Sequence, residues 1–315
     1  MHRSFADWTP IHVTHSTPQP QYLWSRLGTQ RFDDPFFTQT VGTALNSPLP
    51  KLLQRTTSLD ELVAASERES CVEPRGFIFH VSRCGSTLVS QMFARLPRII
   101  TISEAHPLMD ATDDPRLSPE DRRRAFRALI RLYSRKVNGS EIGSVFKLGL
   151  RESFHWQMIA ETFPNTPRLV LHRDPVEVLV SNLMSPCEAA FPGVISAELL
   201  GPSPRPILNN EDYAMFVFSR IYASVLDAAR APGSLTLDYT ALPDAVENRI
   251  APHFGITLTD DERAAMRAAS RINVKDATDK AFTSDSADKQ AGASTALREY
   301  CATFIEPICE QLRRL

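Results

Sequence analysis

The chain has 315 residues, of which 43% are hydrophobic and 23% charged, so it can bury a full core as one large domain or two small ones. Its formal net charge of −2 excludes a global attraction to nucleic acid or to an anionic membrane, and no apolar run approaches the length of a membrane span. We therefore expect no nucleic-acid and no membrane partner, and any anion site must be local.

The first residues lack the apolar segment of a secretory signal, which leads us to expect a cytoplasmic protein. The cysteines are odd in number and lack the C-x-x-C spacing of metal sites, so we expect reduced thiols rather than a disulfide framework. They are Cys71, Cys84, Cys187, Cys301 and Cys309.

Residues 1–70 show scattered aromatics without a clean period, and we interpret them as an N-terminal extension packed on a core at 74–310, within a single domain over 1–315. Ser58 and Glu61 fit a capping box that opens a short helix. Farther along, strands alternate with helices. The sequence therefore predicts an α/β fold, a three-layer sandwich around a mostly parallel sheet.

A short polar loop lies between a buried strand and a helix. Residues 77–81 are an apolar run, residues 82–87 interrupt it, and apolar residues recur at helical spacing from Leu88. The first turn of a helix has N–H groups without partners and a partial positive charge, so such a joint can bind an anion. Gly85 lets the backbone come close to an anion. Arg83 adds a positive charge, and Ser86 and Thr87 add hydroxyl donors. The residues of the loop are Ser82, Arg83, Cys84, Gly85, Ser86 and Thr87.

This loop departs from the P-loop of ATP-binding proteins, which carries a Lys after its last Gly. Here Ser86 follows Gly85, no Gly stands five residues before it, and the cation is Arg83 instead. We predict a phosphate or sulfate site; the alternative is an ordinary strand–helix joint whose polar residues only cap the helix.

Glu104 follows the next predicted strand, residues 97–102. A parallel strand–helix–strand unit brings both carboxyl ends to one edge of the sheet, so Glu104 should approach the loop, beside Arg83. The alternative is that Glu104 is an exposed carboxylate at a helix start. His106, two residues later, is a second candidate for a titratable group near the loop.

A second polar motif follows the strand predicted at 168–172. Asp174 suits the N-cap and Pro175 the first position of a helix that starts there. Arg173 stands at the end of the strand, and Ser181 follows it by eight residues.

The later elements are a helix from Ser118, a strand over 144–147, an irregular segment at 186–210, a helix over 211–230 and a strand over 235–239. The segment at 186–210 has the length and composition of a lid or binding loop, and we expect acceptor specificity there. Residues 270–292 are polar and irregular and contain Lys275, Lys280 and Lys289.

Taken together, the two motifs resemble those of the PAPS-dependent sulfotransferases. The segment 82–87 is similar to their 5′-phosphosulfate loop, and Arg173 to Ser181 match their 3′-phosphate motif at every named position. Lys147, at the end of the strand over 144–147, and Tyr239, before Leu242, match the family's central-strand Lys and its Tyr-x-x-Leu. The resemblance covers roughly residues 74–310.

The resemblance implies a donor, 3′-phosphoadenosine 5′-phosphosulfate (PAPS), with PAP as the product and no metal. It implies that residues 83–88 bind the donor together with Arg173, Ser181 and Tyr239, and that Arg83 and Lys147 stabilise the leaving phosphate. Glu104 would act as the base, as in the tyrosylprotein type. The cytosolic type has a His two residues after the Lys, but this chain has Gly149.

The family's late basic loop is absent, so which of the late lysines meets the phosphates stays open. The acceptor, a small molecule or peptide with a hydroxyl or amine, also stays open. A P-loop nucleotide kinase or phosphotransferase and a non-catalytic PAP-binding sensor are the alternative functions. Cys84, at the start of the helix, is expected to be the most reactive thiol of the five.

Overall fold

A five-stranded sheet forms the centre of the protein. The computed structural model describes residue 5, residues 7–271 and residues 286–315. The strand order is β5-β6-β4-β7-β8, and all four neighbouring pairs are parallel. The prediction of an α/β fold around a parallel sheet is therefore confirmed. The strands are β4 (Pro74–His80), β5 (Ile99–Ser103), β6 (Gly143–Lys147), β7 (Arg168–His172) and β8 (Ser234–Asp238).

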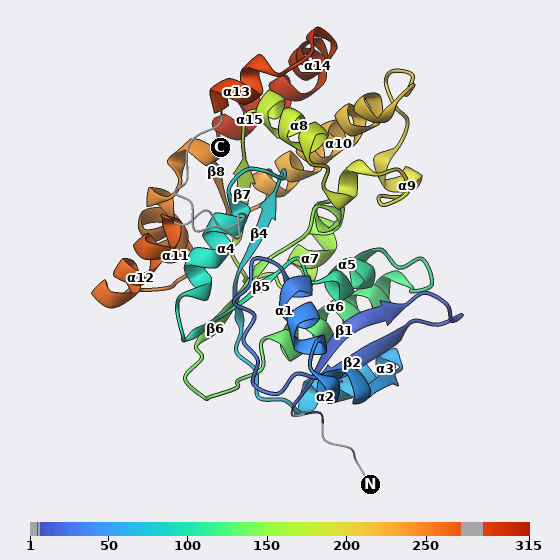
Figure 1. The fold of residues 1–315 in the computed structure, drawn as a ribbon, viewed down its shortest axis with the longest axis vertical. Coiled ribbons are helices and arrows are strands. Elements are labelled where there is room, and N and C mark those ends of the chain that lie inside the picture. The colour runs from blue at the N-terminus through green and yellow to red at the C-terminus, as the bar shows by residue number, and fades with distance from the viewer. Residues whose placement is uncertain (1–4, 6, 272–285) are drawn as a thin grey trace.

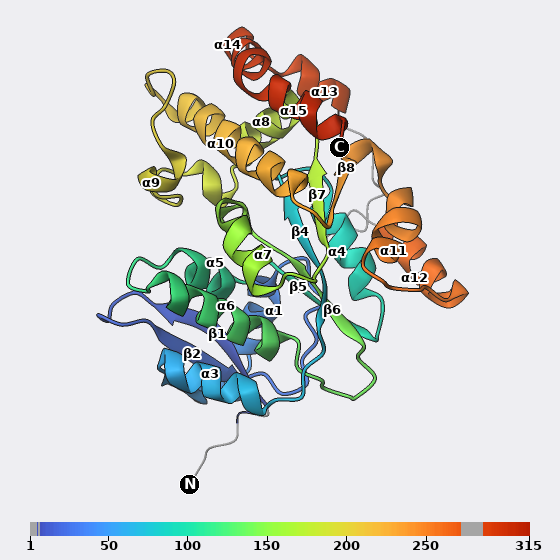
Figure 2. The same ribbon diagram turned by 180° about the vertical axis from the view of Figure 1, so that it is seen from behind.

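Helices cover both faces of this sheet. On one face α4 (Ser86–Ala94) packs with η4 (Val246–Ile250), α11 (Ala251–His253) and α12 (Asp260–Ser270), as Figure 1 shows. The opposite face, seen in Figure 2, carries α6 (Pro119–Tyr133), α7 (Trp156–Thr162) and α10 (Asn210–Arg230). The layers meet closely at Gly76, where a Cβ would lie 2.4 Å from the ring of Phe254. A side chain at this position would therefore displace that ring.

The C-terminal helices pack on α8 (Pro175–Met184) and α10 at one end of the molecule (Figure 1). They are α13 (Ser286–Ala291), α14 (Thr295–Tyr300), η5 (Cys301–Ile305) and α15 (Glu306–Arg313). The short connecting elements are α5 (His106–Asp113), η1 (Arg151–His155), η2 (Glu188–Ala190), α9 (Ala197–Leu200) and η3 (Tyr239–Ala241). The segment at 186–210 is mainly irregular, as expected, and contains η2 and α9.

The N-terminal residues form a second sheet, which the sequence did not predict. Its strands are antiparallel, in the order β1-β2-β3, and it packs on α5 and α6. The register of β1 against β2 shifts between Pro10 and His12, which breaks the alternation that marks a strand in the sequence. The elements are β1 (Trp8–Thr14), β2 (Gln21–Arg26), α1 (Phe37–Leu45), α2 (Pro48–Leu52), β3 (Gln54–Thr57) and α3 (Leu59–Arg68).

The predicted helix starts are confirmed. The Ser58 hydroxyl accepts from the N–H of Glu61, whose carboxylate accepts from the N–H of Ser58, so the capping box forms. Ser118 and Asp174 likewise cap α6 and α8 with their side chains. All five cysteines are free. Among the described residues, no helix is both long enough and apolar enough to cross a membrane.

Candidate functional site

The candidate residues gather at one edge of the parallel sheet, because each follows or ends a different strand and all five strands point the same way. The loop at 82–87 follows β4, Glu104 follows β5 and Lys147 ends β6. Arg173 follows β7, and Tyr239 follows β8.

The loop after β4 has an unusual backbone. Ser82, Arg83 and Gly85 all have positive φ angles, of 68°, 50° and 82°. A left-handed conformation costs a residue other than glycine about 1–3 kcal/mol. Such strained residues cluster at functional sites. Gly85 is the N-cap of α4, and no side chain caps that helix end. The first-turn N–H groups are therefore available to an anion rather than to a capping oxygen.

Gly85 packs closely against the segment that follows β8. A Cβ at this position would lie 2.6 Å from Cδ1 of Leu242 and 3.2 Å from the ring of Tyr239. The ends of β4 and β8 therefore approach each other only because residue 85 has no side chain.

Lys147 and Glu104 form the centre of the site. Nζ of Lys147 lies 2.6 Å from Oε1 of Glu104 and donates to Oγ1 of Thr87 at 3.1 Å. Lys147 is 2% exposed, and its ammonium sits 4.5 Å from the ring centroid of Phe36. Lys147 therefore links Glu104 to Thr87 of the loop, as expected from the prediction that Glu104 approaches it. Phe36 is one of the scattered aromatics of residues 1–70, and its contact with Lys147 was not predicted.

Burial alone would raise the pKa of Glu104, but the charge of Lys147 and the hydrogen bond with His80 outweigh it and hold that pKa well below its ordinary value. Nε2 of His80 lies 3.5 Å from Oε1 of Glu104 and 2.9 Å from the carbonyl of Leu148. The N–H of Ser82 lies 3.1 Å from Nδ1 of His80. Burial lowers the pKa of His80, but its contacts with Cys84 and Glu104 outweigh burial and raise that pKa to about 9.

Arg173 connects the two predicted motifs. Its Nη1 donates to the carbonyl of Arg83 at 3.1 Å, across 90 residues of sequence. Its Nε donates to Oε2 of Glu177 at 2.7 Å, and its guanidinium lies 4.1 Å from the ring centroid of Tyr239. Ser181 lies farther along α8, the helix that begins just after Arg173.

One expectation for the loop stays a prediction, and one is corrected. The guanidinium of Arg83 donates to the carbonyl of Ser185 at 2.6 Å, at the end of α8, and its expected role at the leaving phosphate stays a prediction. Cys84 is fully buried. A thiol without access to solvent is a poor target for alkylation, so burial contradicts the expected high reactivity.

His106 lies at the start of α5, and its side chain is 46% exposed. Its Nε2 is 3.7 Å from Oε2 of Glu188, in the irregular segment at 186–210. Lys275 and Lys280 lie outside the described residues, and Lys289 is on α13. The neighbouring Gln290 donates to Oδ1 of Asp174 at 2.9 Å, which joins α13 to the start of α8.

Glu152 is a further carboxyl close to the site that the sequence analysis missed. It is fully buried on η1, and burial raises its pKa to about 7. No motif marks it, because its position depends on the fold around Gly149.

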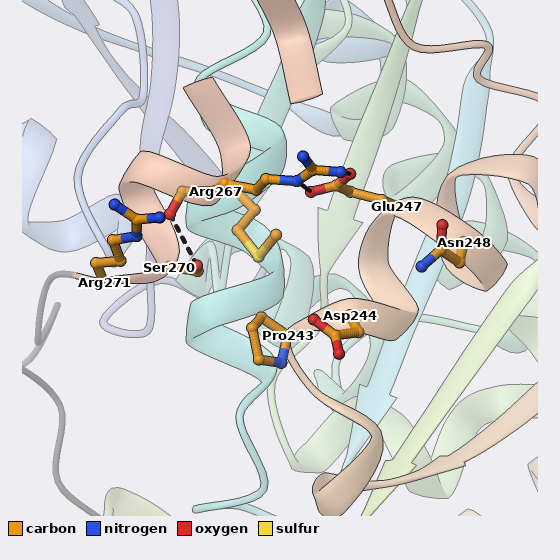
Figure 3. A pocket seen from close by; sticks show the side chains of 8 residues that line it. Pro243, Asp244, Glu247, Asn248, Arg267, Ser270 and Arg271 are labelled. Atoms are coloured by element: carbon orange, nitrogen blue, oxygen red, sulfur yellow. Dashed lines mark hydrogen bonds and ion pairs between the residues drawn. The ribbon is translucent and has the colours of Figure 1, made fainter. Parts of the chain in front are cut away.

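A cavity of about 250 Å³ lies beside the site, between α4, η4 and α12 (Figure 3). Two of the charged residues that line it pair with each other, because Arg267 donates to both carboxylate oxygens of Glu247. The lining residues are Met92, Pro243, Asp244, Glu247, Asn248, Arg267, Ser270 and Arg271.

No family model matches the chain, and no curated protein matches it. Among solved structures, the sulfotransferase STF9 from Mycobacterium avium is similar at a TM-score of 0.47 and 16% identity, over 79% of this chain and 81% of that one. A sulfotransferase from Alicyclobacillus acidocaldarius is similar at a TM-score of 0.45 and 16% identity, over 77% and 95%. The sulfotransferase domain from the curacin biosynthetic pathway is similar at 0.43 and 15%, over 78% and 96%. Likenesses this low do not assign a function, which depends on the site residues.

Proposed function

We propose that this protein is a sulfotransferase that moves the sulfonyl group of PAPS to a hydroxyl or amine of an acceptor. The hydrogen bond from Arg173 to the carbonyl of Arg83 supports the proposal most directly, because it joins the residue proposed for a 3′-phosphate to the loop proposed for a 5′-phosphosulfate. A nucleotide with a phosphate on each side of its ribose fits two adjacent anion sites of this kind.

On the donor side, the N–H groups of residues 85–87 and the ammonium of Lys147 would bind the 5′-phosphosulfate. Arg173 and the hydroxyl of Ser181 would bind the 3′-phosphate. Tyr239 stacks on Arg173 and would meet the adenine side. Arg83 would contribute to this binding through its backbone, since its guanidinium is engaged with Ser185.

In the transfer, the acceptor oxygen or nitrogen bonds to sulfur while the bond from sulfur to the bridging oxygen breaks. Its electron pair stays on the 5′-phosphate of PAP, where Lys147 and the loop amides stabilise the growing charge. Glu104 takes the acceptor's proton. Engagement of Lys147 by the donor would weaken its pair with Glu104, which leaves that carboxylate more basic than in the free protein.

The kinase alternative lacks support in the site. Ser86 stands where an ATP-binding loop has its Lys, and Asp174 caps α8 by accepting from the N–H of Glu177. A Mg²⁺ ligand at a strand end would be expected in a kinase. The sensor alternative shares both anion sites and differs only in lacking turnover.

The test is transfer of ³⁵S from labelled PAPS to a panel of hydroxyl and amine compounds and peptides, with formation of PAP followed in parallel. We expect labelled product with at least one acceptor class and no requirement for added Mg²⁺. Tight PAP binding without turnover over a broad panel would favour the sensor. Phosphate transfer from ATP with Mg²⁺ would refute the proposal.

A further inference from the structure

His80 lies where the ends of three strands meet. It is the last residue of β4 and is 5% exposed. Its Nε2 lies 2.9 Å from the carbonyl of Leu148, which follows β6, and 3.5 Å from Oε1 of Glu104, which follows β5. The ring therefore connects the strand that leads into the loop at 82–87 with the two strands that carry Lys147 and Glu104.

The other ring nitrogen of His80 faces the loop. Nδ1 lies 3.1 Å from the N–H of Ser82, a residue with a φ of 68°, and the side chain of Cys84 also hydrogen-bonds to the ring. A left-handed residue other than glycine persists only where the surrounding structure holds it. The contacts of His80 therefore help to fix the conformation of the loop.

Nε2 of His80 is the nitrogen that donates to the base. It faces two oxygen acceptors, the carbonyl of Leu148 and the carboxylate of Glu104, so it carries a hydrogen. That hydrogen is present in the imidazolium, and also in the neutral tautomer in which Nδ1 accepts. The contact with Glu104 thus does not require a particular charge on the ring.

Glu104 is held by its backbone and by two side chains. Its φ is 52°, and its N–H donates to the carbonyl of Lys147 at 2.8 Å. Its carboxylate lies 2.6 Å from Nζ of Lys147 and 3.5 Å from Nε2 of His80. In the proposed reaction the donor binds Lys147 and weakens the first of these side-chain contacts. The contact with His80 is then the one that keeps the carboxylate in place.

We infer that His80 is a positioning residue, which holds the carboxylate of Glu104 toward the acceptor while Lys147 is engaged by the donor. The inference rests on the proposed sulfotransfer, in which Glu104 takes the acceptor's proton. The acceptor's electron pair forms the bond to sulfur, its proton passes to Glu104, and His80 keeps its own proton. Because the same ring contacts Ser82 and Cys84, it also fixes the base relative to the loop that would bind the donor.

The two ring nitrogens can be tested separately with His80→Asn and His80→Gln. The side chain of Asn ends near the position of Nδ1, so it can accept from the N–H of Ser82 but falls short of Glu104. The side chain of Gln reaches the position of Nε2 and can donate to Glu104. We expect His80→Asn to lower kcat by about 10²-fold, as misplacement of a catalytic group does, with KM for PAPS within about 3-fold of the wild type. His80→Gln should recover most of this loss.

A double variant tests whether His80 acts through Glu104. When Glu104→Gln has already removed the base, adding His80→Asn should lower kcat by no more than about 3-fold, because residues that act as one unit are not additive. His253→Asn is the matched control. Nε2 of His253 lies 3.0 Å from the carbonyl of Arg168 at the start of β7, at the opposite edge of the sheet, and this variant should keep the wild-type kcat.

Wild-type kcat in His80→Asn would overturn the inference and leave the proposed function intact. Equal losses of kcat in His80→Asn and His80→Gln, with weaker PAP binding in both, would reduce His80 to a structural residue and also overturn it. Full additivity in the double variant would do the same. A wild type without PAPS turnover would overturn the proposed function and the inference together.

A further measurement uses the wild type alone, because substitution of a buried ring can prevent folding. In protein labelled with ¹⁵N-histidine, the Nε2–H signal of His80 is followed by NMR as PAP is added. Engagement of Lys147 by the 5′-phosphate should strengthen the hydrogen bond from His80 to Glu104 and move the proton signal downfield. If PAP binds and the signal does not move, the inference is refuted.

Discussion

Nζ of Lys147 lies 2.6 Å from Oε1 of Glu104, and this ion pair joins the ends of β6 and β5 at the centre of the site. The ammonium makes the carboxylate a weaker base, and the negative charge of the carboxylate offsets the positive charge that the ammonium could offer to an anion. A phosphosulfate that binds Lys147 would weaken this ion pair. Donor binding should therefore activate Glu104.

Lys147→Met should weaken both donor binding and turnover. The variant keeps an apolar stem against Phe36 but loses the charge that meets Glu104 and Thr87. We expect kcat to fall by about 10²–10³ and the affinity for PAP to fall by roughly 10-fold. Lys136→Met, at an exposed position, is the control and should leave both unchanged. Steady-state kinetics and calorimetric titration with PAP measure the two effects, and a Lys147→Met variant with normal kcat would exclude a role in the transfer.

Arg173→Ala should remove the preference for a 3′-phosphate. A charge-assisted hydrogen bond contributes about 1.5–3 kcal/mol, so PAP should bind roughly 10- to 100-fold more weakly while 5′-AMP binds almost as before. Each ligand's thermal shift must be compared with the ligand-free variant, because the change also removes a hydrogen bond to Glu177. If PAP and AMP shift the wild type equally, the assignment of Arg173 is wrong.

The two candidate anion motifs could be recognised in the sequence because their signals are local. Gly85 and Asp174 act within one turn of their own helices, and the parallel order of strands brings their ends to one edge. Glu152 could not be found in this way. Its buried position depends on the missing side chain of Gly149 and on Met109 from another helix, which are brought together only by tertiary packing. The N-terminal sheet was missed because the irregular register at Pro10 hides the period of two.

Gly85→Ala should abolish nucleotide binding. The residue has a φ of 82°, and its Cβ would lie 2.6 Å from Leu242 and 3.2 Å from Tyr239. Gly139→Ala is a matched control, since Gly139 also has a φ of 82° but has nothing within 4 Å of the added Cβ. Both variants should lose about 1–2 kcal/mol of stability from backbone strain, and only Gly85→Ala should also lose its thermal shift with PAP. Equal PAP binding by the two variants would show that the close contact of the loop is unimportant.

Glu152 should make the wild type less stable as the pH rises. Its folded-state pKa of about 7 lies above the value of an unfolded Glu, so between the two the folded protein keeps a proton that the unfolded chain has lost. The free energy of unfolding should fall across this interval by an amount on the order of 3 kcal/mol. Urea unfolding at pH 5 and pH 8 measures the difference. In Glu152→Gln the fall should be smaller by this amount, and an unchanged pH dependence would show that Glu152 does not titrate in this range.

Glu104→Gln separates catalysis from donor binding. The amide keeps the shape and can still accept a hydrogen bond from Lys147, but it cannot take the acceptor's proton. A positioned base contributes about 10²–10⁴-fold in rate, so turnover should fall by that factor while PAP affinity changes only a few-fold. His106→Gln is the companion variant, since His106 lies two residues away with a side chain that is 46% exposed. We expect it to retain turnover. Near-normal turnover in Glu104→Gln together with a large loss in His106→Gln would move the base to His106, and the Lys147–Glu104 pair would then serve only to hold the site together.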